Sequence, residues 1–493
     1  MSETSTEPQS SAGEERLSGA ATRARRFTLA ATALGSALAF IDTSVVIVAL
    51  PTIERDLGLG FTGQQWVVLS YSVALAALYL VAGATGDRFG RRRMFVWGIV
   101  GFAAASALAG AAPNESLLVA ARALQGVAGA FLTTNSLALL RAVYGRDAGR
   151  AIGLWTALTS AAIVVGPPVG GALVEWASWR WIFFINLPLA AIAITLVVSC
   201  RPPRSSEREQ QPFDLLGATL AAIGFGFLTF GLVQGQESGY ARVSWALALG
   251  VAALLAFPIH ERRTRAPMLP LELFSRRPFL AANVETLLVY GALGGFLFFF
   301  TIFLQFIGFS AFEAGLINLP VSVVIIALSP TLGRRADARG PKRLLTVGPL
   351  LTAAGMACLI GVSEQSDFWV YGPPGLLLFA LGLAHVVAPI TSTALATAPP
   401  SLSGIAAGVN QTVSRVGNLV AVAIAGLVVA LVFEHVTGDA SAVPLQLGET
   451  SQVLQDGSVS AFRAAIGVCV AFAVAGAAVA ATMLKDERVD TAR

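Results

Sequence analysis

Charged side chains are scarce in this chain: Asp, Glu, Lys and Arg together make up only 13% of its 493 residues. A soluble domain carries about 25% charged residues, so 13% would not cover the several soluble domains that this length otherwise suggests. Hydrophobic residues make up 55% of the chain. The composition therefore excludes soluble, disordered and fibrous proteins and predicts an all-α membrane protein that crosses the bilayer many times.

Cysteine and histidine are equally rare, with three of each. Cys200, Cys358 and Cys469 lie far apart and lack metal or redox spacing, which argues against a disulfide framework or a zinc site. The sequence contains no phosphate-binding glycine loop and no nucleophile–base cluster. We therefore expect neither an enzyme nor an ATP-driven pump, no cofactor, and no nucleic-acid partner.

Long apolar segments take up most of the chain, and a spanning helix needs about 20 apolar residues. Fourteen segments qualify, of which 244–259 is the shortest. They are 27–50, 65–86, 94–112, 117–140, 151–174, 181–200, 214–235, 244–259, 279–304, 314–333, 344–362, 372–396, 404–432 and 460–484.

The distribution of Lys and Arg orients these spans, because cytoplasmic loops carry an excess of both. With the N-terminus inside, the cytoplasmic segments hold 27 of them and the outer loops hold 3. This separation predicts fourteen spans in the plasma membrane with both termini in the cytoplasm. Twelve spans would preserve it only if two adjacent segments were misread. Residues 1–26 and 485–493 are expected to be cytoplasmic tails, the first of them disordered.

A repeated loop divides the spans into two halves. The pattern Gly-x3-Asp-x2-Gly-x-basic-basic begins at Gly83 and recurs with the same spacing at Gly333. Both copies fall in predicted cytoplasmic loops, so the halves have the same orientation, as in many secondary transporters. The predicted parts are a six-helix bundle over 27–200, a linker with two inserted spanning helices over 201–278, and a six-helix bundle over 279–484.

The chemistry of this loop suits a gate. Glycine permits sharp turns, an aspartate favours the positive end of the next helix, and the basic residues can pair with acids or last-turn carbonyls. The loop either latches an inner gate or only enforces topology. The residues concerned are Gly83, Asp87, Arg88, Gly90, Arg92, Arg93, Asp337, Gly340 and Arg343.

Four stretches of the sequence form a recognisable set. They are the 83–93 loop, DTSVVIVALP at 42–51, Leu118, Arg122, Gln125, Gly126, Gly129 and Ala130, and GPPVGG at 166–171 followed by WRWIFFINLP at 179–188. Together they resemble the major facilitator superfamily, and specifically its fourteen-helix drug:proton antiporters, over roughly residues 27–484. Ile47 departs from the family pattern, which usually has Asn there. Ala162 replaces a usual Gly, and Pro168 adds a second proline.

The glycines and prolines of the 166–171 stretch have a physical reading of their own. Such residues bend a membrane helix and permit close packing, so this helix could seal the inward leak path against the other half. In the family that this chain resembles, the motif marks export rather than uptake. Its residues here are Gly166, Pro167, Gly170 and Gly171.

Ionisable residues inside spans are functional hypotheses by default. In the fold that the chain resembles, four helices line the cavity, and here these carry Asp42, Arg122, Glu285 and His385. Asp42 and Arg122 lie at similar depths and could reach each other. Asp42 is therefore the first candidate for proton coupling, with Arg122 adjusting its affinity for the proton. The alternative is a fixed structural ion pair. Glu285 either takes a proton, attracts a cationic drug, or is simply hydrated.

Aromatic and polar residues in the same spans suggest a substrate surface. Phe299 belongs to a run of phenylalanines, most of which should pack or face lipid, while a subset could stack on flat lipophilic cations. His385 is either a packing residue or a relay. Arg415 has Asn410, Gln411 and Ser414 nearby in sequence as expected local partners. The candidate cavity residues are Gln125, His385, Phe299, Gln305 and Arg415.

The sequence therefore predicts a multi-pass exporter that uses the proton gradient to expel amphipathic, cationic or aromatic drugs, and so confers antibiotic resistance. Its partners would be these small molecules, protons and the lipid bilayer. The alternative is an exporter of a lipid or a self-made natural product on the same scaffold.

Overall fold

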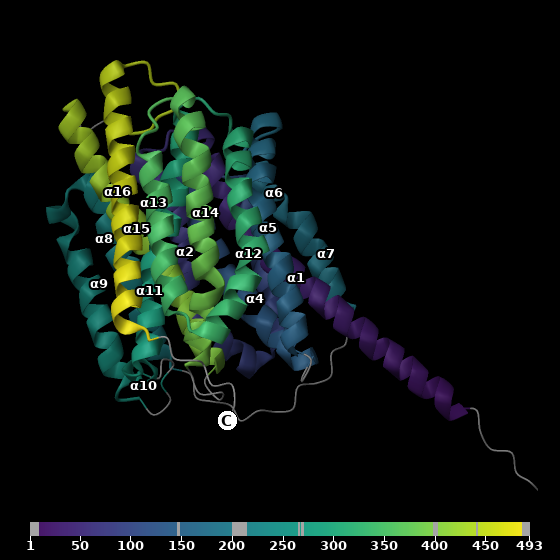
Figure 1. Cartoon of the computed structure of the whole chain (residues 1–493). Coiled ribbons are helices and arrows are strands. Elements are labelled where there is room, and N and C mark those ends of the chain that lie inside the picture. Colours follow the sequence, from purple (N-terminus) through teal and green to yellow (C-terminus); the bar gives the residue numbers. More distant parts are fainter. Residues whose placement is uncertain are drawn as a thin grey trace, which may run out of the picture.

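The computed structural model describes residues 9–144, 148–199, 214–264, 267, 271–397, 403–439 and 442–485, and the regular elements in these ranges are all helices. Figure 1 shows them side by side along one common direction. They are α1 (Gln9–Leu57), α2 (Phe61–Phe89), α3 (Arg91–Gly110), α4 (Glu115–Tyr144), α5 (Ala148–Trp176), α6 (Trp181–Phe184), α7 (Asn186–Val198), α8 (Leu215–Ser238), α9 (Tyr240–Glu261), α10 (Glu272–Ser275), α11 (Arg277–Phe306), α12 (Ala311–Arg339), α13 (Lys342–Leu359), α14 (Gln365–Ala396), α15 (Ser403–Thr437) and α16 (Gln452–Met483).

Each of the fourteen predicted segments falls on helix, with the segment 181–200 divided into α6 and α7. By length and apolar composition, eleven stretches of the described chain qualify as membrane spans, with α6 and α7 counted together. The helices left out are α2, α5 and α13; the apolar part of α5, Ala161–Trp176, is short. The all-helical architecture is thus as predicted, whereas the count of fourteen spans is not confirmed.

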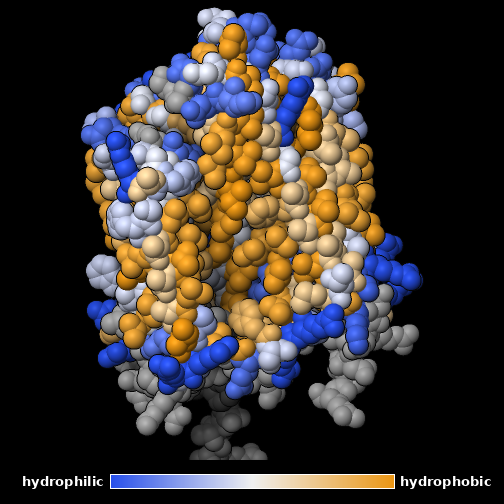
Figure 2. Space-filling view, turned by 90° about the vertical axis from the view of Figure 1, so that its left-hand side faces the viewer, coloured by the Kyte–Doolittle hydropathy of each residue, from blue (hydrophilic) through white to orange (hydrophobic). Residues whose placement is uncertain are grey.

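The surface has the polarity pattern of a membrane protein. Figure 2 shows an apolar belt between two polar ends. Large apolar side chains on the helices are widely exposed, for example Leu255 of α9 at 63% and Val370 of α14 at 66%. A soluble protein rarely exposes so large a continuous apolar surface, so the belt fits contact with lipid.

The start of α1 differs from the sequence prediction. Residues 9–26 were expected to be disordered, but the structure has them as helix continuous with the apolar part of α1 (Figure 1). This segment contains several Ala, Glu and Arg residues, which have high helix propensity. Residues 1–8 and 486–493, the rest of the predicted tails, lie outside the described ranges.

The internal repeat is visible in the backbone. Residues 61–89 of α2 recur as residues 311–339 of α12, with the same length of 29 residues. Gly90 and Gly340 end these two helices with φ of +97° and +89°, and their amides donate to Gly86 O at 3.0 Å and Ala336 O at 2.9 Å. Below, the end of the bundle where α2 and α12 stop is called the Gly90 end, and the opposite end, where α11 stops, the Gln305 end.

Replacing either of these capping glycines should destabilise the protein. Gly90→Ala and Gly340→Ala each place a Cβ on a positive-φ residue, which costs about 1–3 kcal/mol. We expect a lower unfolding temperature in detergent for both variants. Gly226→Ala in α8 is the control, because a Cβ there meets no heavy atom within 4 Å and its φ is not positive. Equal unfolding temperatures in all three variants would contradict this account of the repeated loop.

The first half consists of α1–α7 and the second of α11–α16, and they meet along two seams. The α5–α12 seam is close: a Cβ on Gly171 would lie 2.4 Å from Ala311 O, and one on Gly315 would lie 2.4 Å from Pro167 O. The other seam lies between α2 and α15. The inserted helices α8 and α9 pack on each other, and α8 contacts both α2 and α15.

Candidate functional site

The centre of the first half holds a buried ion pair. Asp42 on α1 and Arg122 on α4 are each 1% exposed, and Arg122 Nη1 donates to Asp42 Oδ2. The other carboxylate oxygen, Oδ1, accepts from Gln125 Nε2 at 3.1 Å and from Asn186 Nδ2 at 3.2 Å. Three donors from two other helices therefore fix the carboxylate. We call Asp42, Ser106, Arg122, Gln125 and Asn186 the Asp42 cluster.

Arg122 is held as firmly as its partner. Its Nε donates to Val67 O on α2 at 3.0 Å, and Nη1 also donates to Gln125 Oε1 at 2.9 Å. The guanidinium carbon lies 4.6 Å from the ring centroid of Tyr71. Removing one partner from such a buried pair leaves an uncompensated charge, so the two residues form one electrostatic unit.

Two members of this cluster were not predicted as site residues. Asn186, at the start of α7, belongs to the WRWIFFINLP stretch that carried the family resemblance, and a buried amide within an apolar segment was the available signal. Ser106 on α3 accepts from Gln125 Nε2 at 2.7 Å and from Asn186 Nδ2 at 3.3 Å. A serine in an alanine-rich segment gives no comparable signal. Gln125, predicted to line a cavity, lies inside the cluster instead.

Glu285 on α11 faces the interior of the second half. Its side chain is fully buried, and neither carboxylate oxygen has a hydrogen-bond partner among the described residues. A Cβ on Gly476 of α16 would lie 3.9 Å from Glu285 Cγ. The residue thus lies at the packed junction of α11 and α16, away from the seams. The roles expected for Glu285, which are proton uptake, attraction of a cationic drug or simple hydration, stay predictions.

The remaining cavity candidates lie in three different places. Phe299 is fully buried and packs on Phe61 of α2, with ring centroids 6.3 Å apart, while Gln305 Nε2 donates to Val48 O at 2.9 Å. Both therefore join the two halves near the Gln305 end. His385 on α14 is hydrogen-bonded through Nδ1 to Leu381 O of its own helix at 2.7 Å. Arg415 on α15 lies 6.0 Å from the ring centroid of Phe40 on α1.

The 166–171 motif packs on two helices. A Cβ on Gly166 would lie 2.0 Å from Ser44 Oγ of α1, and a Cβ on Gly170 would lie 2.6 Å from Val45 Cγ1 of the same helix. Gly171 faces α12 of the other half, as described above. Pro167 and Pro168 both lie inside the continuous α5 helix. The motif thus lets α5 approach both its own half and the partner half closely.

At Arg92 the first copy of the repeated loop contacts its own half. Arg92 Nη2 donates to Val197 O at 3.0 Å and to Val198 O at 3.1 Å, so it caps the last turn of α7. The side chains of Asp87 and Asp337 lie outside the described part of the structure. The bonds of Arg92 thus form no latch between the halves. Of the other predicted gating residues, Arg88, Arg93 and Arg343 are exposed.

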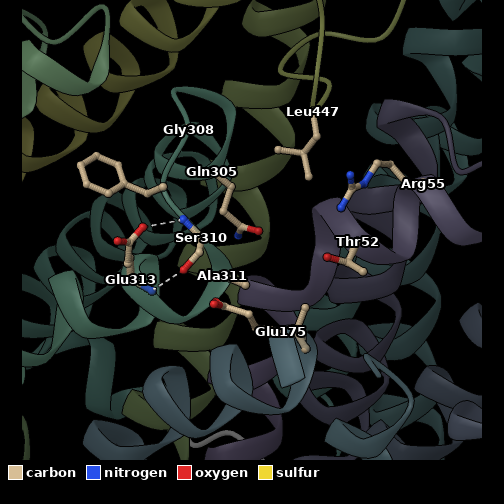
Figure 3. A pocket seen from close by; sticks show the side chains of 11 residues that line it. Thr52, Arg55, Glu175, Gln305, Gly308, Ser310, Ala311, Glu313 and Leu447 are labelled. Atoms are coloured by element: carbon tan, nitrogen blue, oxygen red, sulfur yellow. Dashed lines mark hydrogen bonds between the residues drawn. The ribbon is translucent and has the colours of Figure 1, made fainter. Parts of the chain in front are cut away.

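A pocket of about 480 Å³ opens between the halves at the Gln305 end (Figure 3). Glu313 forms a capping box with Ser310 at the start of α12, and Glu175 Oε2 of α5 accepts from Phe312 N at 3.3 Å. A carboxylate of the first half thus lies at the N-terminus of a helix of the second half, where the helix dipole favours negative charge. The pocket is lined by Thr52, Arg55, Val174, Glu175, Gln305, Gly308, Phe309, Ser310, Ala311, Glu313 and Leu447.

Comparison with known proteins decides the family. A profile of the Major Facilitator Superfamily matches residues 32–422. The chain belongs to the Major Facilitator Superfamily. The bacterial homologue of the human lysosomal transporter Spinster, solved in an inward-facing conformation, matches with a TM-score of 0.66 over 93% of this chain and 96% of that one, at 16% identity. A D-xylose–proton symporter matches with a TM-score of 0.63 over 94% and 99%, at 14% identity. These likenesses show the fold.

Curated members of the superfamily that resemble this chain are named for drug resistance. The multidrug resistance protein Stp of Mycobacterium tuberculosis is 33% identical over 416 residues, 83% of this chain and 76% of Stp. The tetracenomycin C resistance and export protein of Streptomyces glaucescens is 34% identical over 82% and 76%, and the puromycin resistance protein pur8 of Streptomyces alboniger is 34% identical over 92% and 90%. This superfamily chain is thus a membrane transporter, not an enzyme, with drug-efflux proteins as relatives.

Proposed function

We propose that this transporter exports amphipathic drugs across the bacterial plasma membrane in exchange for protons, using fourteen spans with both termini in the cytoplasm. The names of the relatives support drug export. The excess of Lys and Arg in alternate loops supports a cytoplasmic Gly90 end and an outer Gln305 end. Under this orientation the contacts Phe61–Phe299 and Gln305–Val48 form an outer gate that is closed.

The observation that carries proton coupling is the Asp42 cluster. A carboxylate that is 1% exposed and held by an arginine costs free energy to keep inside a membrane, and exchange of a proton at Asp42 would break and remake its pair with Arg122. A protonated carboxyl needs an acceptor for its new O–H. Asn186 Oδ1 is buried without a partner among the described residues, so a turn of this amide would supply one.

Coupling follows if the two charge states of Asp42 favour different arrangements of the halves. A ligand shifts a conformational equilibrium only by its differential affinity for the two states, and here the proton is that ligand. The Asp42 cluster joins α1, α3, α4 and α7 to the backbone of α2. A change at Asp42 therefore reaches α1, which contacts α11 of the other half, and α2, which contacts α15.

Transport in everted membrane vesicles tests this function. Puromycin, the compound in one relative's name, and the dye rhodamine 6G should accumulate when the vesicle interior is acid. Accumulation should stop when nigericin collapses the pH gradient. ATP added in the presence of nigericin should not restore accumulation. Accumulation that persists without a pH gradient, or that requires sodium instead, would contradict proton antiport.

Lipid export is the alternative on the same scaffold, and helix length does not favour it. α15 has 35 residues and would be about 50 Å long, more than the roughly 30 Å of a bilayer core. The last span, α16, has 32 residues, but α14, which is not one of the last two spans, has 32 as well. Excess length is therefore not confined to the last two spans.

A further inference from the structure

Arg415 carries a charge in the middle of the membrane that no acid in the described part of the chain neutralises. It lies about 18 Å along α15 from Ser403 and is partly exposed. Its guanidinium carbon is 6.0 Å from the ring centroid of Phe40 on α1. Among the described residues it has neither an acid within salt-bridge distance nor a hydrogen-bond acceptor, and the expected partners Asn410 and Ser414 bond elsewhere. Arg415 thus faces the first half without a partner.

The surroundings of Arg415 come from both halves and are aromatic. Besides Phe40, its charge lies within electrostatic range of the phenol groups of Tyr71 on α2 and Tyr290 on α11. The guanidinium on α15 thus lies against α1 of the first half, in a region shared with α2 of that half and α11 of its own half. This is the position from which a side chain meets a molecule held between the halves.

The acids inside the membrane are committed elsewhere. Asp42 is paired with Arg122, and Glu285 is enclosed between α11 and α16. Neither carboxylate is left to balance Arg415, so the net charge that these side chains present between the halves is positive. An unpaired arginine at this depth is expensive, and a mobile partner of opposite charge would offset that cost during each transport cycle.

We propose that Arg415 is the anion-binding residue of the substrate site, and that the substrates include flat aromatic compounds bearing a carboxylate or another acidic group. The guanidinium fork matches a carboxylate with two parallel hydrogen bonds, and rings can stack on the partly exposed Phe40 and Tyr290. This inference rests on the proposed export function and replaces the expected preference for cations. An acidic lipid headgroup presents the same chemistry.

A matched pair of dyes tests the charge preference. Fluorescein and rhodamine 6G share a xanthene ring system but have opposite charges at neutral pH. In proteoliposomes of neutral phosphatidylcholine, we expect Arg415→Gln to weaken fluorescein binding and export by at least about tenfold, as for loss of a charge-assisted pair, and to leave rhodamine 6G unchanged or improved. Arg415→Lys, which keeps the charge but not the fork, should retain part of the fluorescein affinity.

Arg463→Gln is the control, because Arg463 is exposed on α16 and donates to Ile360 O at 3.0 Å. It should leave both dyes unaffected. Fluorescein binding that is absent in the unaltered protein, unchanged in Arg415→Gln, or lost equally with rhodamine 6G in both Arg415 variants would overturn the proposal. Proton-driven rhodamine 6G export together with fluorescein binding that Arg415→Gln leaves unchanged would reject this site alone, whereas Arg415-dependent fluorescein binding without proton-driven export would reject the export function alone.

Changing the lipid composition distinguishes the two possible sources of the anion, a lipid headgroup and a free aromatic acid. Proteoliposomes that contain phosphatidylglycerol present an acidic headgroup from the bilayer. If phosphatidylglycerol competes with fluorescein in the unaltered protein and Arg415→Gln abolishes the competition, Arg415 takes a lipid headgroup. If fluorescein binding is the same in both membranes, Arg415 takes the free aromatic anion. Either result supports an anion site.

Discussion

Asp42→Asn is expected to stop proton-driven export while substrate binding is retained. Asparagine preserves the shape of the side chain and an acceptor for Arg122, but it cannot gain or lose a proton. Everted vesicles carrying this variant should accumulate no more rhodamine 6G than vesicles without the protein when the interior is acid. Binding of the dye to the purified variant should persist, since the change affects the coupling site and not the seam between the halves.

The control for this experiment is Asp56→Asn, the same substitution farther along α1. Asp56 is exposed and accepts from Trp179 Nε1 at 2.8 Å at the Gln305 end, so its loss should leave export intact. If the buried Arg122 charge destabilises Asp42→Asn, the double variant Asp42→Asn/Arg122→Gln removes that charge and should fold without regaining coupling. Near-normal export driven by a pH gradient in either Asp42 variant would exclude Asp42 from the mechanism.

Gly171→Leu is expected to open the α5–α12 seam at the Gln305 end. A Cβ at this position would lie 2.4 Å from Ala311 O and 2.6 Å from Phe312 Cα, and both atoms are backbone, so no side chain can move aside. Overpacking of this kind costs about 1–3 kcal/mol. Because the two helices belong to different halves, the strain is relieved when the halves separate there. The variant should be trapped open to the outside and should not export.

Accessibility at Gln305 measures this opening. A cysteine placed at Gln305 should react faster with a membrane-impermeant thiol reagent added outside when Gly171→Leu is also present. Gly467→Leu on α16 is the matched control, because a Cβ there meets no heavy atom within 4 Å. Equal labelling rates in the two backgrounds would show that the Gly171 contact does not hold the outer gate closed.

The fold could largely be read from the sequence, since composition determines the environment and hydrophobic segments determine the helices. The repeated glycines were equally informative, because the positive φ at Gly90 and Gly340 demands that residue type. The approach of Asp42 to Arg122 also followed from counting residues along two helices. The position of a residue along a helix axis depends only on the number of residues between it and the helix end, so a single sequence is enough to estimate it.

The direction in which a side chain faces was not predictable in the same way. Glu285 was expected on a cavity-lining helix, yet its side chain lies against α16, where the absence of a side chain at Gly476 makes room for it. Arg415 was assigned the partners nearest in sequence, but Asn410 Nδ2 donates instead to Thr286 Oγ1 of α11 at 2.8 Å. Such choices depend on packing between helices far apart in the chain.

The inserted pair α8–α9 makes the two seams unequal. In the repeat, α2 and α15 correspond to α12 and α5, and Gln65 corresponds to Gly315. At the α5–α12 seam, Gly315 lets the helices touch; at the other, Gln65 lies against Gly426 and exchanges hydrogen bonds with Gln236 of α8. At the Gln305 end, one seam is thus closed by direct contact between two helices, and the other is additionally covered by α8. The two faces that the internal repeat would make alike are therefore different in this molecule, and a molecule in the surrounding lipid meets a bare seam on one side and a covered seam on the other.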